Sequence, residues 1–421
     1  MRSAQIVERN FFPLDDELAL PTGGLTPYAQ ECLVRIGAWL PFEQTAELLN
    51  DMLGIQVSTA QVRRVTEAAG AAYVTVQSEE ADQIEREAPI ATAGIDKAVI
   101  SVDGALIPLR HGEWAEVKTL VVGEVQPAQL EKGEWVVHSR KLSYFSRLAD
   151  ADRFAHLTLV EMHRRGLEKS RQVAAVMDGA EWEQGFVDYH CPQAVRILDF
   201  PHAGQRIGQI GQVIWGEGSP QAGQWTIERL HQLKHQGPTA ILTELSELKA
   251  QHPQSEVIAE NLGYLEKRQA QMQYPDFQAQ GWPIGSGIVE SGNKLVVEAR
   301  LKGAGMHWER INVNPMLGLR NIVCSDRWSE AWPVINRQMR QQTRDHRNHN
   351  REKRRLAKLP ILPEVVSPPP AEVREEPLVV IPNVEAPKQT SNEPRKPAAN
   401  HPWRHSPIGR ALYEPSKSAK K

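Results

Sequence analysis

The order of strand-like and helix-like segments between residues 98 and 200 constrains the fold of this chain most strongly. Apolar runs and alternating patterns predict five strands, and apolar residues at helical spacing predict two helices. In chain order the segments are strand, strand, strand, helix, strand, helix and strand: Ile100–Asp103, Trp114–Val125, Trp135–Phe145, Asp150–Gly166, Val173–Asp178, Glu181–His190 and Ala194–Phe200. The sequence therefore predicts an α/β core in which helices cover a mixed sheet.

This order matches that of the ribonuclease-H-like fold, a mixed sheet with helices on both faces. In that fold the first and fourth strands are neighbours at the centre of the sheet. Asp103 ends the first predicted strand and Asp178 ends the fourth. We therefore expect the two carboxylates to meet at one end of the sheet.

A third carboxylate is expected from a later helix. Glu290 lies in Gly-Ser-Gly-Ile-Val-Glu-Ser, at the start of the helix-like stretch Glu290–Leu301. Glu298 is the alternative, since eight residues place the two side chains about 80° apart around a helix axis. We favour Glu290 because it adjoins a glycine-rich segment at which the chain can turn sharply.

Three carboxylates in this arrangement predict a site for two Mg²⁺ or Mn²⁺ ions, which prefer oxygen ligands. Two ions about 4 Å apart stabilise the entering and leaving oxygens when a phosphodiester bond is cut or joined. We expect Asp103 to bridge the ions, with Asp178 completing one ion site and Glu290 the other. Simpler interpretations exist, because Asp-Gly after an apolar run is typical of a turn and a glutamate at a helix start interacts with the macrodipole.

Asp199 and His202 follow the fifth predicted strand in the run Asp-Phe-Pro-His. Asp199 could be a fourth carboxylate of the metal site or a partner of its ligands, with His202 touching a phosphate. A strand-ending aspartate and a capping histidine are an equally good interpretation.

The N-terminal region predicts helices at Pro27–Leu40, Phe42–Leu53 and Thr59–Ala69, followed by a connecting helix over residues 71–90. The second and third of these fit a helix-turn-helix, whose second helix enters the major groove of DNA. Its expected DNA contacts are Thr59, Gln61, Arg63 and Arg64. A small helical bundle without DNA contacts has the same pattern.

A basic region follows Glu290. Between Lys294 and Lys358 there are fifteen Lys and Arg against six Asp and Glu. This excess predicts a surface for the DNA backbone, although a solvated helix face has a similar composition. Lys294, Arg300 and Lys302 suit phosphate contacts. Trp308 is expected either to stack on a displaced base or to belong to the core.

Composition and patterning divide the chain into six segments. They are an irregular arm (1–25), the helix-turn-helix domain with its linker helix (26–90), the first part of the core (95–203), a helical insertion (204–284), the second part of the core with a basic helix (285–358) and a Pro-rich disordered tail (359–421). No apolar run approaches the ~20 residues needed to span a bilayer, and the N-terminus lacks a signal-peptide core. The three cysteines form no Cys-x-x-Cys pair, which argues against a disulfide framework. We therefore expect a cytoplasmic protein without a membrane partner.

Six longer motifs lie between residues 102 and 308: Val-Asp-Gly-Ala-Leu-Ile-Pro-Leu, Glu-Trp-Ala-Glu-Val-Lys-Thr-Leu-Val-Val-Gly-Glu-Val, Val-Met-Asp-Gly-Ala-Glu-Trp, Arg-Ile-Leu-Asp-Phe-Pro-His-Ala, Gly-Trp-Pro-Ile-Gly-Ser-Gly-Ile-Val-Glu-Ser and Ala-Arg-Leu-Lys-Gly-Ala-Gly-Met-His-Trp. They resemble the motifs of bacterial insertion-sequence transposases of the ISKra type, over about residues 25 to 340. The resemblance implies a DDE transposase with a ribonuclease-H-like core, two divalent metal ions and the triad Asp103, Asp178 and Glu290.

Two features can be compared with other transposase families, one as a resemblance and one as a departure. Its Asp199-x-x-His202 element resembles the Cys/Asp-x-x-His element of Mutator-like transposases, which also carry a helical insertion before the glutamate. Some insertion-sequence families place a lysine seven residues after that glutamate. Position 297 is valine here, so Lys294 or Lys302 would have to serve.

The resemblance implies that the protein binds the terminal inverted repeats of its element, cuts one strand at each end and joins the freed 3′-hydroxyl to target DNA. A homodimer on double-stranded DNA is expected, because two element ends must be held together, and a bacterial, nucleoid-associated location follows. The alternatives are a DNA-binding protein that has lost catalysis and a nuclease of the same fold without joining activity.

Overall fold

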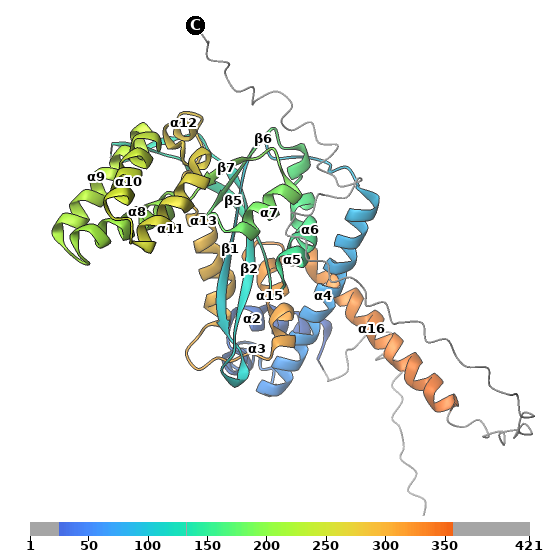
Figure 1. The fold of residues 1–421 in the computed structure, drawn as a ribbon. Helices are drawn as coiled ribbons and strands as arrows, with labels where there is room; N and C mark the ends of the chain where they lie inside the picture. The colour runs from blue at the N-terminus through green and yellow to red at the C-terminus, as the bar shows by residue number, and fades with distance from the viewer. Residues whose placement is uncertain (1–24, 132, 357–421) are drawn as a thin grey trace, which may run out of the picture.

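A five-stranded mixed sheet with the strand order β5-β2-β1-β6-β7 forms the centre of the molecule (Figure 1). The computed structural model describes residues 25–131 and 133–356. Its strands are β1 (Lys97–Pro108), β2 (Trp114–Val125), β5 (Ser139–Arg147), β6 (Gln172–Met177) and β7 (Val195–Leu198), and a separate hairpin pairs β3 (Gln129–Glu131) with β4 (Glu134–Val136). The five predicted strands are present, and the first and fourth, β1 and β6, are neighbours as predicted. The predicted tail, and the predicted arm apart from Leu25, lie outside the described residues.

β1 is longer than predicted. Asp103 does not end the strand but lies in its middle, opposite Thr119 of β2. The prediction of a strand end there is wrong, because β2 pairs with β1 as far as Pro108 and satisfies its backbone groups. β6 pairs with β1 only from Lys97 to Ile100. Asp103 therefore lies just beyond the part of β1 that β6 covers, and its position still corresponds to the end of β6.

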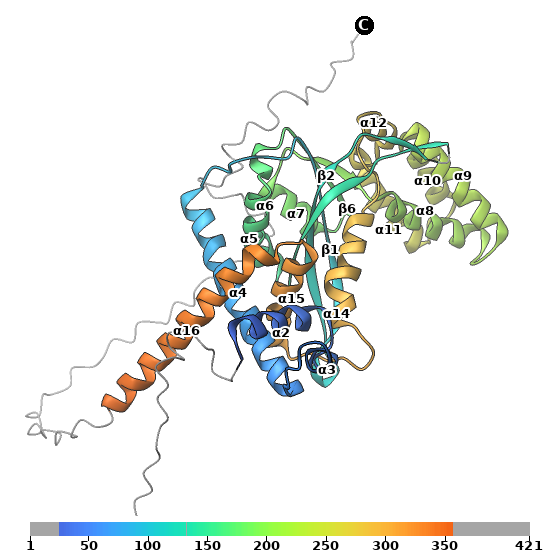
Figure 2. The same ribbon diagram turned by 180° about the vertical axis from the view of Figure 1, so that it is seen from behind.

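Helices cover both faces of the sheet, because side chains on successive strand residues point to opposite sides. Ala98, Ile100 and Val102 of β1 pack in one cluster with α5 (Ala151–Leu157), α6 (Leu159–Arg164), α7 (Glu181–His190) and the end of α4 (Thr59–Glu87). Val99 belongs to a second cluster on the other face, with helices of the predicted insertion. The sheet is thus the middle layer of the core (Figures 1 and 2).

The predicted insertion consists of helices that project to one side of the sheet (Figure 1). They are α8 (Phe200–Trp215), α9 (Pro220–Gln236), α10 (Thr239–Gln251), α11 (Glu256–Lys267) and α12 (Tyr274–Ala279). Trp225, Leu245 and Leu262 are buried among them in the same cluster as Ala174 and Ile197 of the sheet. The helices are therefore anchored on β6 and β7, the strands that end beside the carboxylates.

The N-terminal helices are α2 (Pro27–Trp39), α3 (Phe42–Leu53) and α4, which runs unbroken for 29 residues. The prediction of two separate helices on either side of Gly70 is wrong. A Cβ at Gly70 would lie 2.1 Å from the Pro315 carbonyl oxygen, so this glycine allows α4 to pack closely against α15 (Arg310–Cys324) instead of ending the helix. The three helices share a core with α15 and α16 (Trp328–Leu356).

The predicted glutamate helix extends from residue 287 to residue 301. It comprises α13 (Gly287–Gly292), a π-helical segment η4 (Asn293–Glu298) and α14 (Ala299–Leu301). Val289 and Val296 of this helix are buried against Val121 of β2, on the face opposite α7.

Throughout the described ranges, no helix combines the length and the apolarity that crossing a membrane requires.

Candidate metal centre

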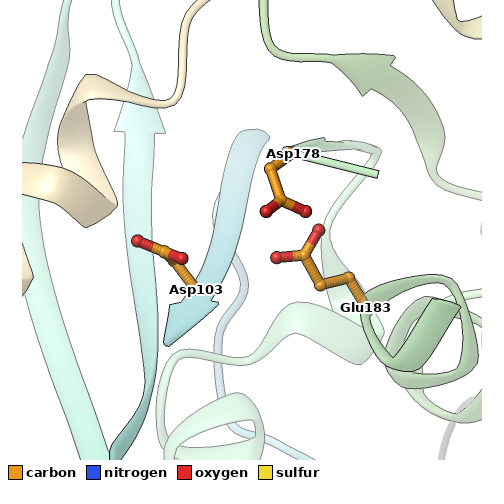
Figure 3. Close-up of side chains that lie close together, drawn as sticks. All are labelled: Asp103, Asp178 and Glu183. Carbon is orange, nitrogen blue, oxygen red and sulfur yellow. The ribbon is translucent and has the colours of Figure 1, made fainter. Parts of the chain in front are cut away.

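Three carboxylates from separate elements lie together beside the end of β6 (Figure 3). Asp103 comes from β1, Asp178 from the residue after β6, and Glu183 from the first turn of α7. Each offers an oxygen atom, and these oxygens all lie within 4.8 Å of one another. Oxygen donors at this spacing could hold a metal ion. The structure therefore brings Asp103 and Asp178 together, as predicted, but adds a third carboxylate that was not predicted.

Asp103 is held in place by two hydrogen bonds. Its carboxylate accepts from the backbone N–H of Gly104 at 2.7 Å and from Nδ2 of Asn293 at 2.9 Å. Burial raises the pKa of Asp103 to about 6, with further raising by the charges of Asp178 and Glu290, while the two hydrogen bonds lower it. A carboxylate in this state gains from a nearby cation, because the cation offsets both burial and repulsion.

Glu183 is almost fully buried and reaches back from α7 to the turn before it. Its carboxylate accepts from the N–H of Gly179 at 3.0 Å, as in a capping interaction at a helix start. Burial, the hydrogen bond with Asp178 and the charge of Asp178 together raise the pKa of Glu183 to about 10. At neutral pH and without a cation, this raised pKa favours the neutral form of Glu183, whose O–H donates a hydrogen bond to the Asp178 carboxylate.

The turn that carries Asp178 is fastened by α11. The Tyr264 hydroxyl donates to the Asp178 carbonyl oxygen, and Nε of Arg268 donates to the Gly179 carbonyl oxygen at 2.9 Å. Gly179 has a φ of +89°, and a Cβ there would lie 2.5 Å from Nε of Arg268. The side chain of Asp178 also accepts from the N–H of Ala180 at 2.7 Å. The helices between β7 and the Glu290 helix thus fix the backbone of this turn.

Glu290 lies outside the three-carboxylate cluster, and its side chain is exposed. It is nevertheless close enough for its charge to raise the pKa of Asp103. One turn further along the same helix, Asn293 contacts Asp103 directly. The alternative, Glu298, is paired instead with Lys302 at 3.0 Å. The structure therefore places Glu290 beside the cluster without making it a member.

Asn293 itself is a further candidate residue that the sequence interpretation missed. It is 6% exposed, and its Oδ1 atom has no hydrogen-bond partner among the described residues. A buried amide oxygen without a partner, next to carboxylates, suits a hard divalent cation, which takes both carboxylate and amide oxygens as ligands. The donor set of the site therefore fits Mg²⁺ or Mn²⁺.

Asp199 joins two segments of the backbone through its carboxylate. Its carboxylate accepts from the N–H of His202 at 2.9 Å, at the start of α8, and from the N–H of Ser286 at 2.6 Å. It therefore ties α8 to the segment that leads into the Glu290 helix. His202 is half-buried at that helix start. The capping residue is thus Asp199 and not His202, as the structural alternative had it, and Asp199 lies outside the carboxylate cluster.

The candidate DNA contacts on α4 lie at its exposed start. Thr59, Arg63 and Arg64 are exposed and Gln61 is half-buried. Gln61 and the two arginines line a hollow of about 690 Å³, whose other wall includes Asn312 of α15. Lys294 and Lys302 are exposed on the Glu290 helix.

Burial contradicts the predicted DNA contact of Arg300 and agrees with the core alternative for Trp308. Arg300 is 2% exposed, with its guanidinium 4.7 Å from the Phe42 ring centre and Nε donating to the Gly37 carbonyl oxygen at 3.3 Å. Trp308 is buried, and its indole N–H donates to the Leu301 carbonyl oxygen at 3.1 Å. Both side chains join the Glu290 helix to its neighbours, so neither can reach a phosphate or a base in this structure.

The signals for the missed residues were present in the sequence. Glu183 is the third residue of a helix that starts directly after the Asp178 turn, where a glutamate commonly reaches back to the turn. Asn293 follows Glu290 by one helical turn and so shares its face.

The chain matches no protein-family model and none of the curated proteins with which it was compared.

Proposed function

We propose that this protein is a DDE transposase of the ISKra type, with a ribonuclease-H-like catalytic core. The observation that carries this proposal is the cluster of Asp103, Asp178 and Glu183 at neighbouring strands, with the Glu290 helix bonded to Asp103 through Asn293. The strand order β5-β2-β1-β6-β7, with β2 antiparallel and β6 parallel to β1, supports the proposed core.

In this proposal Asp103 and Asp178 would hold Mg²⁺ or Mn²⁺, and Glu290 would complete a site for two ions. When bound, the ions would stabilise the charge that develops on the entering and leaving oxygens at phosphorus. Glu183 positions Asp178 by donating a hydrogen bond to it, and Asn293 positions Asp103. Glu183 is the alternative third ligand, since its carboxylate already lies in the cluster.

The DNA partners are proposals of the same kind. The residues at the start of α4 (Thr59, Gln61, Arg63 and Arg64) would contact the terminal inverted repeats, with Lys294 and Lys302 near the cut strand. A homodimer would hold the two element ends together. The DNA contacts are supported by the exposure and the positive charge of Arg63, Arg64, Lys294 and Lys302.

A plasmid assay tests the proposal. The substrate carries the inverted repeats that flank the gene, and nicking and joining to a target plasmid are measured with Mg²⁺, with Mn²⁺ and with chelator. We expect nicking only with a divalent cation and a loss of at least a hundredfold in Asp103→Asn and Asp178→Asn. Joining of 3′ ends supports the transposase, and nicking without joining supports the nuclease. No metal-dependent nicking by the wild-type chain would contradict both.

The same assay distinguishes the third ligand. If Glu290 is the ligand, Glu290→Gln abolishes nicking and Glu183→Gln lowers it by a smaller factor, because glutamine keeps the hydrogen bond to Asp178. If the reverse is found, Glu183 is the ligand and the assignment of Glu290 is wrong. Glu298→Gln, on the same helix but paired with Lys302, is the matched control and should retain activity.

A further inference from the structure

Helix α16 leaves the body of the molecule after its first three turns (Figures 1 and 2). Trp328, Trp332 and Ile335 are buried in the core that α16 shares with the N-terminal helices. From residue 340 to residue 355, by contrast, every residue is exposed except the half-buried Asn350. The anchored start supplies the nucleus that a helix of this length needs, and the rest forms an arm, here residues 340–355.

Arginines follow one side of this helix at a regular spacing. They alternate at intervals of three and four residues: Arg337, Arg340, Arg344, Arg347, Arg351 and Arg354. At about 100° per residue these six side chains fall within an arc of about 100°, and they span about 26 Å along the axis. The two acidic residues of the arm, Asp345 and Glu352, lie outside that arc. The arginines therefore form a continuous basic stripe, and all six are exposed.

The composition of the arm restricts the class of partner. Residues 340–355 contain no apolar side chain, so the arm has no face to bury against a protein groove or to insert into a bilayer. They also contain no Trp, Tyr or Phe, which single-strand binding uses to stack bases. Arginines three and four residues apart repel one another along the helix. A polyanion relieves this repulsion.

We propose that the α16 arm is a sequence-independent docking element for double-stranded DNA, in which the arginine stripe follows the phosphates beside the major groove. B-form DNA admits an α-helix into its major groove, whereas the major groove of A-form RNA is too narrow. Arginine contacts to phosphate hold DNA without reading its sequence. The inference rests on the proposed function only for DNA being the substrate, and it gives the arm the task of holding DNA outside the carboxylate site.

Binding of a 40-base-pair duplex without inverted repeats tests the arm. The full-length protein is titrated by fluorescence anisotropy in chelator, from 50 to 300 mM salt, so the carboxylate site contributes no catalysis. The stripe variant combines Arg340→Gln, Arg344→Gln and Arg351→Gln. The matched control combines Gln342→Glu, His349→Glu and Lys353→Gln on the opposite side of the helix, and lowers the net charge by the same three units.

We expect the stripe variant to bind at least tenfold more weakly at 100 mM salt. Its slope of log affinity against log salt should fall by about 2 to 3, since each lost phosphate contact removes about 0.9. The control should lose less than threefold, and circular dichroism should show equal helix content. Equal losses in both variants, or none in either, would overturn the proposal.

Two further probes separate other partners from DNA. Stripe-dependent binding of anionic vesicles or single-stranded RNA that is tighter than binding of the duplex would also overturn it. Because binding is measured without divalent cations, a failure of metal-dependent nicking leaves this result unaffected. The proposed function and the role of the arm can therefore fail separately.

Discussion

At the scale of single residues, Glu183 is the most deeply buried carboxyl group of the cluster, at 1% exposed. Glu183 has its pKa raised to about 10 by burial, by its hydrogen bond to Asp178 and by the charge of Asp178. Burial also raises the pKa of Asp103, to about 6. A site that keeps acidic groups buried in this way lowers the stability of the fold at neutral pH, which is a common feature of functional sites.

The buried proton predicts a pH-dependent gain in stability for Glu183→Gln. Unfolding returns the pKa of Glu183 to its usual value near 4.5, so the wild-type fold loses stability as the pH rises above that value. Glutamine keeps both hydrogen bonds and does not titrate. In chelator we expect the variant to be more stable by about 2 to 3 kcal/mol at pH 7, with no difference near pH 4.

Urea unfolding at each pH measures this difference. Glu181→Gln, two residues earlier in α7 and exposed, is the control and should show no such trend. A variant at position 183 that is equally or less stable than the wild type at every pH would contradict the protonated state of Glu183.

At the scale of elements, a helix from the insertion fixes the geometry of the site. The guanidinium groups of Arg206 and Arg268 lie 4.4 and 3.9 Å from the Tyr264 ring centre. These contacts fix Tyr264 and Arg268, the two side chains that hydrogen-bond to the Asp178 turn. The insertion therefore fixes the backbone conformation of the turn that carries Asp178.

Removal of the hydrogen bonds from Arg268 to the Asp178 turn is expected to weaken metal binding. Arg268→Met deletes the donors to the Gly179 carbonyl oxygen and should lower Mn²⁺ affinity about tenfold, through a less well-oriented Asp178. Lys267→Met, the exposed neighbour on α11, should leave affinity unchanged. Isothermal calorimetry with Mn²⁺ and no DNA gives the comparison. Equal affinity in both variants would show that α11 does not position the ligand.

Helix packing predicts opposite effects of alanine at two helical glycines. Gly70→Ala places a methyl group against the Pro315 backbone and should destabilise the protein by about 1 to 3 kcal/mol by separating α4 from α15. Gly223→Ala on α9 has open space around the new methyl group and should stabilise by about 0.5 to 1 kcal/mol. Thermal unfolding of the two variants measures the signs. A stabilising change at Gly70 would contradict the close contact of these helices.

At the scale of the whole molecule, the sequence predicted the strands, their central pair and most helices because these depend on local periodicity. Asp103 and Asp178 were expected together because the predicted element order matches that of the ribonuclease-H-like fold, in which the first and fourth strands are neighbours. The sequence could not show that β1 continues past Asp103, since that depends on pairing with β2. Arg300 was misjudged and Trp308 was left open because their burial depends on α2 and α3, which are distant in sequence but adjacent in the fold.

The candidate cation site depends on the whole fold, because its carboxylates come from β1, from the end of β6 and from α7. Anomalous diffraction from crystals soaked in Mn²⁺ tests it most directly. We predict density between Asp103 and Asp178 in the wild-type protein and its loss in Asp178→Asn. Crystals of the wild type that show no Mn²⁺ there at saturating concentration, with the three carboxylates ordered, would contradict the central claim.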